Sequence, residues 1–371
     1  MRWRDPAGRQ RKKTFERRVD AQRFLATISA DVVRGTYVDP NDPTTFSEYA
    51  EAWREAQVHR PTTRARVETN LRRHAYPYFG DRRLSTIRPS EIQGWVTTLS
   101  RRLSPATVQV IHGIVAAIFK AAVRDRLVGR LVGGSRCDST RLPKKRPIGV
   151  MPLSTSTVHA LAEAVPERYR AIVLLGAGTG LRQGECFGLD DEHIDFDRHT
   201  LRVDQQLLLL PHREPFLGPP KTSASYRTIP LPGVVVDALR QHLRSFPVQH
   251  IDRLVFTDDD GRAISRTRFS REVWRPAVAA AGARRGTGFH DLRHYYASLL
   301  IRHGESVKTV QRRLGHATAA ETLDTYAHLW PDSEDRTRNA IDSVLRAARP
   351  AAPHEGARSS SRTHFREGPM P

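Results

Sequence analysis

Between residues 43 and 128, apolar side chains recur every three or four positions, which is the spacing of α-helices that each bury one side. Thr45 to Glu48 has the sequence of an N-terminal capping box, and Ser104-Pro105 supplies a helix cap followed by a first-turn proline. We interpret the apolar stripes as core. The pattern predicts an all-helical unit with helices from about Phe46, over Thr63–Tyr78, over Ser90–Leu99 and from Pro105 through Ala122.

From residue 151 to about residue 346 the pattern remains mainly helical, with one β interruption. Two short strands are expected between His193 and Val203, around the turn Asp197-Arg198-His199. Before them, an apolar helix from Tyr169 to Gly176 runs into Gly178-Thr179-Gly180, a turn that starts the next helix. The fold class is therefore mainly α with small β elements.

The remaining segments have weaker apolar periodicity. Near the N-terminus we expect a strand and turn from Trp3 to Arg9, a second strand from Lys13 to Phe15 and a helix from Asp20 to Arg34. Residues 129–150 are basic and rich in Pro and Gly, as in a linker. The polar residues 347–371 are expected to be disordered.

Composition adds a strong positive charge to this picture. Among 371 residues there are 60 Lys and Arg against 40 Asp and Glu, which gives a net charge of +20. Such a surface attracts polyanions, of which nucleic acid is the commonest, although an inert basic surface or a ribosome-associated protein has the same composition. Only seven of the basic residues are lysines, so each lysine is conspicuous.

Several other classes of protein are disfavoured. Two cysteines, Cys137 and Cys186, are too few for a disulfide framework or a zinc site. No apolar run is judged long enough to span a membrane, and Met1 to Arg4 lacks the apolar segment of a signal peptide, so a cytoplasmic protein is expected. Histidines at four positions suggest a metal site only weakly, because histidine pairs more often serve hydrogen bonding; the four are His290, His294, His316 and His328.

Candidate chemistry lies in three blocks of the C-terminal half. Arg182 follows the Gly178-Thr179-Gly180 turn at a helix N-terminus, where a positive side chain beside free amide groups favours phosphate. His290 and Arg293 are three residues apart and share a helix face. Leu314-Gly315-His316 precedes a lone tyrosine, Tyr326, by ten residues. Tyr295 and Tyr296 are rival nucleophiles, but their positions favour a core role.

These blocks, in this order and with a lysine between the first two, resemble the tyrosine recombinases of the phage integrase type. The resemblance implies a helical core-binding (SAM-like) domain, a mixed catalytic domain, and Lys221 on a β-hairpin of residues 219–230. Neither metal nor cofactor is implied, because the covalent enzyme–DNA bond stores the energy of the broken one. The implied catalytic set is Arg182 and Arg293 as phosphate clamp, His290 as acceptor of the tyrosine proton, His316 as orienting group, Lys221 as acid for the leaving hydroxyl and Tyr326 as nucleophile forming a 3′-phosphotyrosyl link.

The same resemblance divides the chain into units. Residues 1–42 correspond to an arm-type DNA-binding domain lacking its first strand, so the domain is expected to be degenerate or the start codon to lie upstream. Two further domains follow, separated by the linker and followed by the tail. The expected divisions are 1–42 arm-type domain, 43–128 core-binding domain, 129–150 linker, 151–346 catalytic domain and 347–371 tail.

The expected partners are double-stranded DNA attachment sites, three further copies of the chain in a homotetramer on DNA, and DNA-bending and directionality factors. An apolar stripe at Ala340, Ile341, Val344 and Leu345 would dock on a neighbouring protomer, or fold back on its own domain. A nucleoid-associated integrase or excisionase of a mobile element is the leading interpretation. Three alternatives remain: a chromosome-dimer-resolving recombinase, a type IB topoisomerase and a non-catalytic DNA-binding protein.

Overall fold

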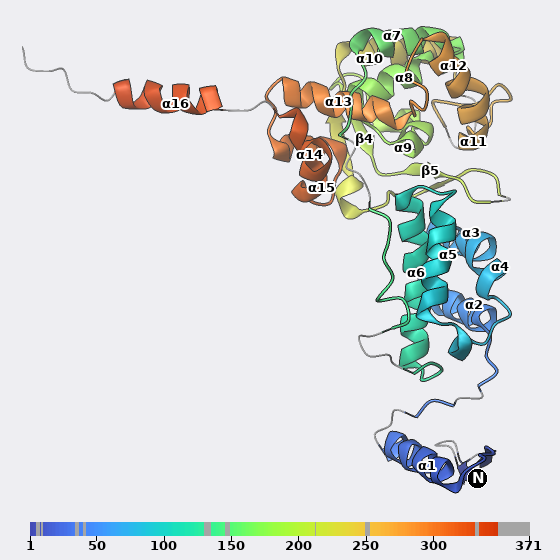
Figure 1. Ribbon diagram of the computed structural model, residues 1–371. Helices are drawn as coiled ribbons and strands as arrows, with labels where there is room; N and C mark the ends of the chain where they lie inside the picture. The colour runs from blue at the N-terminus through green and yellow to red at the C-terminus, as the bar shows by residue number, and fades with distance from the viewer. Residues whose placement is uncertain are drawn as a thin grey trace, which may run out of the picture.

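The computed structural model describes residues 1–4, 8, 10–33, 37–39, 42–129, 135–144, 149–211, 213–248, 253–330 and 334–347. The tail expected to be disordered and parts of the linker lie outside these ranges. The described chain is mainly helical with short strands, which confirms the predicted fold class. A small N-terminal part, a helical part and a larger C-terminal part follow one another along an elongated molecule (Figure 1).

The N-terminal part consists of a two-stranded sheet and one helix. Strands β1 (Arg2–Arg4) and β2 (Gln10–Lys12) are antiparallel, and Trp3 pairs with Arg11. Helix α1 (Arg18–Val33) follows. The predicted strand at residues 13–15 is wrong, because there the side chains turn toward the helix: Lys13 Nζ lies 4.5 Å from the centre of the Phe24 ring and the Phe15 ring lies 5.1 Å from it.

The helical part has the predicted helices with small shifts at their ends. The capping box is confirmed, since the Thr45 side chain accepts from the Glu48 amide and the Glu48 carboxylate accepts from the Thr45 amide at 2.8 Å. The predicted helix over 63–78 is interrupted by a π-turn. The elements are α2 (Phe46–Ala56), α3 (Pro61–Asn70), π-turn η1 (Leu71–Ala75), α4 (Tyr76–Phe79), η2 (Leu84–Thr86), α5 (Pro89–Ser100) and α6 (Pro105–Arg124).

Helix α6 is the central helix of this part. By length and apolar composition it is able to cross a membrane, so the expectation that no apolar run reaches that length is wrong. Its apolar side is instead core: Val108, Ile118 and Phe119 are fully buried and pack in one cluster with residues of α2, α4 and α5. Core helices of soluble proteins reach the same length and apolar content.

The C-terminal part is built around helix α8 (Glu167–Thr179), which packs against helices on several sides. Its neighbours are α7 (Thr155–Ala164), α10 (Gly233–Ser245) and α13 (His290–Arg302). Below α8 lies α9 (Gln183–Phe187). Other elements here are η3 (Asp191–His193), α11 (Arg266–Arg268), η5 (Phe269–Trp274), α12 (Arg275–Ala280), α14 (Val307–Leu314), α15 (Ala319–Tyr326) and η6 (Ala327–Leu329).

Two small antiparallel sheets interrupt the helices. Strands β3 (Ile194–Asp195), β4 (Thr200–Val203) and β7 (Arg227–Pro230) form one sheet in the order β3-β4-β7, with Leu201 opposite Ile229. The predicted turn between β3 and β4 is confirmed, and His199 in it has a positive φ of 51°. Strands β5 (Gln206–Leu208) and β6 (Phe216–Gly218) pair with each other. This β5–β6 pair lies between the C-terminal part and the helical part (Figure 1).

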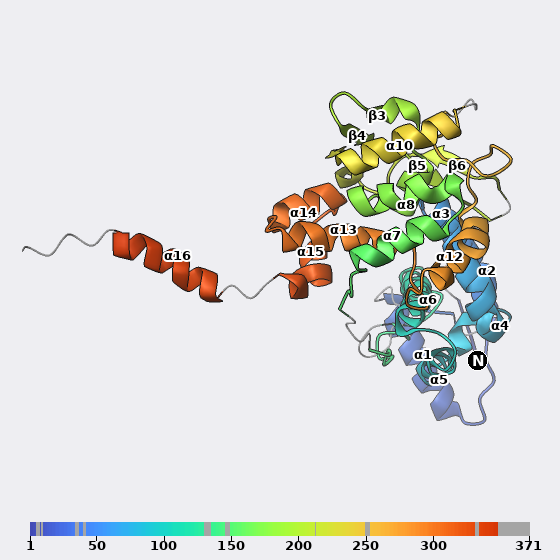
Figure 2. The same cartoon turned by 90° about the horizontal axis from the view of Figure 1, so that it is seen from above.

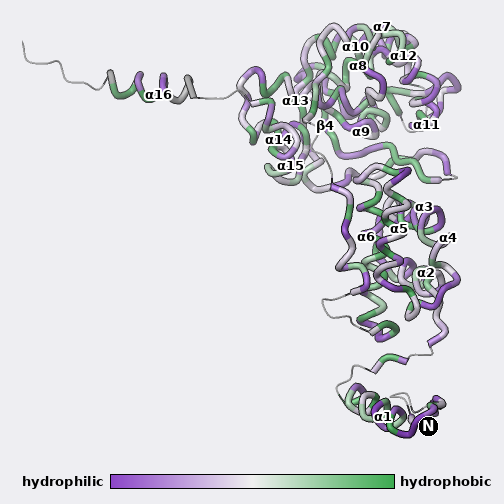
Figure 3. The backbone as a smooth tube through the Cα atoms, in the orientation of Figure 1, coloured by the Kyte–Doolittle hydropathy of each residue, from purple (hydrophilic) through white to green (hydrophobic). Residues whose placement is uncertain are grey.

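The last described helix, α16 (Glu334–Ala347), stands away from the rest of the chain in both Figure 1 and Figure 2. Hydrophilic and hydrophobic residues alternate along it (Figure 3). Ile341, Val344 and Leu345 are 54%, 67% and 66% exposed. The predicted apolar stripe is therefore uncovered in the isolated chain.

Candidate active site

A left-handed glycine sets the position of Arg182. Helix α8 ends at Gly180, whose φ is 66°, and a Cβ at this residue would lie 2.4 Å from the Tyr296 ring. The chain reverses there, and Arg182 becomes the cap residue at the start of α9. The sequence indicated this turn correctly, because only glycine adopts such a backbone without strain in so crowded a place.

The Arg182 guanidinium is fixed by three partners. Nη1 donates to Glu185 Oε1 at 3.0 Å and to Ser225 Oγ at 3.3 Å, and Nη2 donates to the carbonyl of Gly315 at 3.0 Å. The side chain is 27% exposed, so it remains open to a ligand on one side. These contacts join the α8–α9 turn, the segment before β7 and the end of α14.

Arg293 is the most deeply buried charge of the site. The residue is 2% exposed and donates from Nη1 to the Gly180 carbonyl at 2.8 Å and from Nη2 to the Leu314 carbonyl at 2.7 Å. Burial, helped by the charges of Arg182 and Arg227, lowers the pKa of Arg293 to about 9, so it stays protonated at neutral pH. One guanidinium thus binds the carbonyls of Gly180 and Leu314, which are far apart in the sequence.

Glu185 and Arg227 form a buried ion pair behind the two arginines. Arg227 Nη2 donates to Glu185 Oε2 at 2.8 Å and Nη1 donates to Oε1 at 3.2 Å, while Nε donates to the Arg313 carbonyl at 2.9 Å. Burial alone would raise the pKa of Glu185, but Arg227 and Arg182 hold it below its ordinary value. Glu185 is thus a buried structural partner of the two arginines.

Arg227 is a residue that sequence reasoning missed. The available signal was its place in the strand, where it stands two residues before the buried Ile229 and so faces the same side. With it, three guanidiniums, those of Arg182, Arg227 and Arg293, surround one carboxylate, Glu185. The cluster therefore carries an excess of positive charge that suits a bound phosphodiester.

His316 follows a second left-handed glycine. Gly315, with φ 64°, caps α14, and the His316 that follows it is 7% exposed. His316 Nδ1 lies 2.8 Å from Thr322 Oγ1, and its ring stacks on that of Tyr326 with centroids 6.4 Å apart. Burial first, and then the nearby arginines, lower the pKa of His316 to about 3, so the ring is neutral.

Tyr326 ends α15 inside this cluster. The residue is 1% exposed, and burial raises the pKa of its hydroxyl to about 12, although Arg293 and Arg182 oppose the rise. Its Oη lies 2.8 Å from His294 Nδ1. The resemblance implied His290 as acceptor of the tyrosine proton. In this structure the hydrogen-bond partner of the hydroxyl is His294, and His290 lies beside His294, so the role of His290 stays a prediction.

His290 is exposed at the wall of a cleft, and its ring centre lies 4.7 Å from that of His294. Desolvation by surrounding protein atoms, together with His294 and nearby arginines, lowers the pKa of His290 to about 4. The rival tyrosines are core residues, as expected: Tyr295 and Tyr296 are 8% and 7% exposed. The Tyr295 hydroxyl lies 3.0 Å from Thr155 Oγ1 of helix α7 and not among the groups that contact Arg182 and Arg293.

Lys221 is not at the tip of a hairpin, contrary to the expectation. Strand β7 pairs with β4 and strand β6 pairs with β5, so residues 219–226 connect two different sheets. Lys221 is exposed there. The connection is held close to the site, because Thr222 Oγ1 lies 3.0 Å from Ser225 Oγ, the partner of Arg182. On its other side Arg60 Nη1 donates to the Pro220 carbonyl at 3.1 Å, a contact from the helical part.

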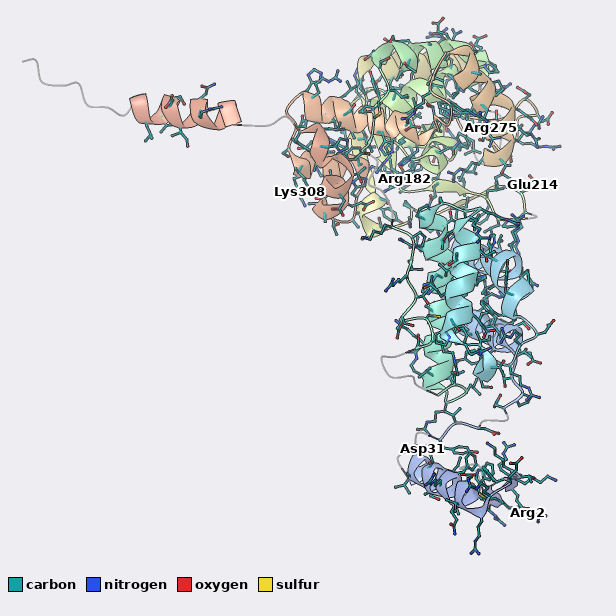
Figure 4. All side chains as sticks on the ribbon, viewed as in Figure 1. Arg2, Asp31, Arg182, Glu214, Arg275 and Lys308 are labelled. Carbon is teal, nitrogen blue, oxygen red and sulfur yellow. The ribbon has the colours of Figure 1, made fainter. Side chains whose placement is uncertain are left out.

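An open cleft of about 1340 Å³ leads to these residues. Its lining runs from Thr62 of the helical part to His290, and among the described residues none that lines it is acidic. Figure 4 shows Arg182 where the C-terminal part faces the helical part. The arginines that line the cleft are Arg182, Arg266, Arg275 and Arg285. Charge of one sign along such a cleft fits a polyanion.

No group of three or more potential metal ligands occurs within the described ranges. Cys137 and Cys186 are buried and unpaired with each other, and burial raises the pKa of each thiol. The site thus consists of guanidinium, imidazole and phenol groups. Such groups can hold a phosphodiester and transfer it to tyrosine.

The chain is similar to known proteins over most of its length. Residues 153–332 match the model of the phage integrase family, and residues 45–100 match the N-terminal SAM-like domain of phage integrases. The prophage phiRv2 integrase of Mycobacterium tuberculosis is 29% identical over 347 residues, which cover 90% of this chain and 88% of that protein. The integrase of Mycobacterium phage D29 is 25% identical over 82% of this chain and 83% of its own length.

A similar fold is found in the Tn1549 transposon integrase, solved in complex with a circular intermediate DNA. The TM-score is 0.65 at 19% identity, and the match covers 80% of this chain and 98% of that one. The two family models together span more than half of the chain. The chain therefore belongs to the phage integrase family of tyrosine recombinases, DNA breaking-and-rejoining enzymes, and acts in the site-specific recombination of a mobile element.

Proposed function

We propose that this integrase cuts DNA by attack of Tyr326 on the scissile phosphate, forming a 3′-phosphotyrosyl link that a second strand's 5′-hydroxyl then resolves. The observation that carries the proposal is that the buried Tyr326 stacks with the buried His316 and lies within the field of the buried Arg293, beside a basic cleft. A phosphodiester resists attack because its non-bridging oxygens repel nucleophiles. Fixed guanidiniums remove that barrier.

Six residues share the work in this proposal. Arg182, whose side chain is partly exposed, binds the non-bridging oxygens of the phosphate. The buried Arg293 contributes positive charge from the interior of the protein. His290, exposed in the cleft, and the neutral His316 contact the same phosphate. Lys221, exposed on a loop docked at Arg182, protonates the leaving 5′-oxygen. Tyr326 is the nucleophile, and neither metal nor nucleotide cofactor enters the reaction.

Removing one hydroxyl tests the nucleophile. Tyr326→Phe should abolish covalent trapping on a nicked suicide substrate and leave DNA binding nearly intact, since the ring still fills its buried place. Tyr295→Phe and Tyr296→Phe are the matched controls and should still form the covalent complex. Trapping that survives in Tyr326→Phe, with the loss falling on one of the control variants in folded form, would reassign the nucleophile.

We further propose that four copies assemble on paired attachment sites, where α16 of each docks on its neighbour. The exposed apolar side of α16 supports this arrangement, because one heterologous contact repeated four times closes a ring. Residues 1–42 would bind arm-type sites, residues 43–128 and 151–346 would enclose the core site, and 129–150 would link them. DNA-bending and directionality factors and a nucleoid location in the cytoplasm complete the proposal.

A further inference from the structure

His294 is the one side chain, among the described residues, that is hydrogen-bonded to the Tyr326 hydroxyl. It stands on α13 directly after Arg293, so the helix that supplies the clamp also supplies this contact. The Nδ1–Oη distance of 2.8 Å is that of a well-formed hydrogen bond. His294 has no part in the catalytic set inferred from the sequence.

Before the reaction the hydroxyl carries a proton and the imidazole is free to accept one, so the protonation states permit transfer from oxygen to nitrogen. Burial lowers the pKa of His294, so the imidazole is neutral at pH 7, whereas the buried Tyr326 keeps its proton. In the tautomer with its proton on Nε2, Nδ1 accepts a hydrogen bond from the hydroxyl. The hydroxyl also lies within the fields of Arg293 and Arg182, which would stabilise the phenolate as it forms.

The other basic groups near Tyr326 are less suited to this task. His290 meets His294 edge to face, and within the described part of the chain the hydroxyl is hydrogen-bonded to His294 and not to His290. His316 stacks on the face of the tyrosine ring, and its Nδ1 is engaged by Thr322. Arginine stays protonated at neutral pH and cannot accept a proton.

We propose that His294 Nδ1 is the general base that receives the Tyr326 proton during strand cleavage. This inference rests on the proposed function. As Oη bonds to phosphorus, the O–H proton passes to Nδ1 and the bond from phosphorus to the 5′-oxygen breaks, that oxygen taking a proton from Lys221. In the second step a 5′-hydroxyl displaces the tyrosine and gives its proton to the neutral Lys221, while the imidazolium returns its proton to Oη, so the cycle needs no other reactant.

Two substitutions separate a base from a mere hydrogen-bond partner. His294→Asn keeps a polar atom near the position of Nδ1 but cannot take up a proton, and His294→Phe keeps a ring without nitrogen. Each is made with tyrosine or with a fluorinated, more acidic tyrosine at position 326. His303→Asn is the matched control, because His303 is an exposed histidine at the C-terminus of the same helix.

The readout is the single-turnover rate of covalent complex formation on a suicide substrate, with DNA binding and thermal melting as checks on folding. Both His294 variants should lose about a hundredfold or more in rate, the scale of general base catalysis. The fluorinated tyrosine should restore much of that loss, because a more acidic phenol needs a base less. The His303 variant should keep the wild-type rate with either tyrosine.

Three results would overturn the inference. Near-normal cleavage by His294→Asn would reduce His294 to a hydrogen-bond partner, and faster cleavage by either variant would make it a restraint on the tyrosine. Rescue of His290→Asn by fluorinated tyrosine, without rescue of His294→Asn, would give the base role to His290. Each of these results leaves the proposed function intact as long as Tyr326→Phe abolishes covalent trapping. Failure of the His294 inference is therefore distinguishable from failure of the proposed function.

Discussion

At the scale of single residues, some side chains of the site are open to a phosphate, and others only hold the first kind in position. Arg182 is partly open, whereas Arg227 has a side chain only 4% exposed and is occupied by Glu185. Substituting Arg227 with Ala should lower the free energy of unfolding by about 3–5 kcal/mol, because the buried carboxylate loses its main partner. Urea denaturation measures the change.

The matched control for Arg227→Ala is Arg198→Ala, whose side chain is 85% exposed and should change stability by less than about 0.5 kcal/mol. A double variant, Glu185→Gln with Arg227→Gln, removes both charges and should recover part of the loss. A single Arg227→Ala variant as stable as wild type would show that Arg182 alone compensates Glu185.

The variants Lys221→Ala and Arg182→Ala should lose cleavage activity for different reasons. Lys221→Ala removes an exposed side chain, so folding should be unchanged and cleavage slow; a substrate with a bridging sulfur at the 5′ position should restore the rate, since thiolate leaves without an acid. Arg182→Ala should lose at least about a hundredfold on both substrates, because charge stabilisation is missing in each. Single-turnover cleavage measures both, and equal failure of Lys221→Ala on the two substrates would remove it from the acid role.

At the scale of elements, local signals in the sequence were reliable and long-range pairings were not. The capping box at Thr45 and the helix cap at Ser104 depend on three or four consecutive residues, and both are present. The hairpin expected at 219–230 depends on which distant strand pairs with which, and the strand expected at 13–15 is replaced by packing of Lys13 and Phe15 on helix α1. The helical phase that brings His294 rather than His290 to Tyr326 depends on how α13 and α15 pack, which a motif does not encode.

The turn between α8 and α9 gives a prediction at this scale. Gly180→Ala should destabilise the protein by about 1–3 kcal/mol and lower cleavage, because a Cβ meets the Tyr296 ring at 2.4 Å and φ is positive. Gly113→Ala is the same change inside α6, with nothing within 4 Å of the new Cβ, and should be neutral or stabilising. Thermal unfolding compares them, and equal melting temperatures would mean that the turn relaxes freely.

At the scale of the whole molecule, separate clusters of buried side chains lie in the N-terminal, helical and C-terminal parts, and the domain divisions expected from the sequence stay a prediction. The cleft between the last two depends on contacts such as Arg60 with Pro220, which only the folded chain brings together. How the copies meet on DNA depends on surfaces that an isolated chain leaves open. Helix α16 is the clearest of these.

Truncation after Pro331 tests the assembly. Because α16 stands apart with Ile341, Val344 and Leu345 exposed, its removal should uncover no core, and the shortened chain should melt within about 1 °C of the full chain. It should bind a single attachment site normally but fail to bring two sites together in a native gel. Replacing the three apolar residues with serine should reproduce that failure in the full-length chain. An insoluble or strongly destabilised product would instead mean that α16 packs against its own catalytic part in solution, and normal synapsis by the truncated chain would remove α16 from the protomer interface.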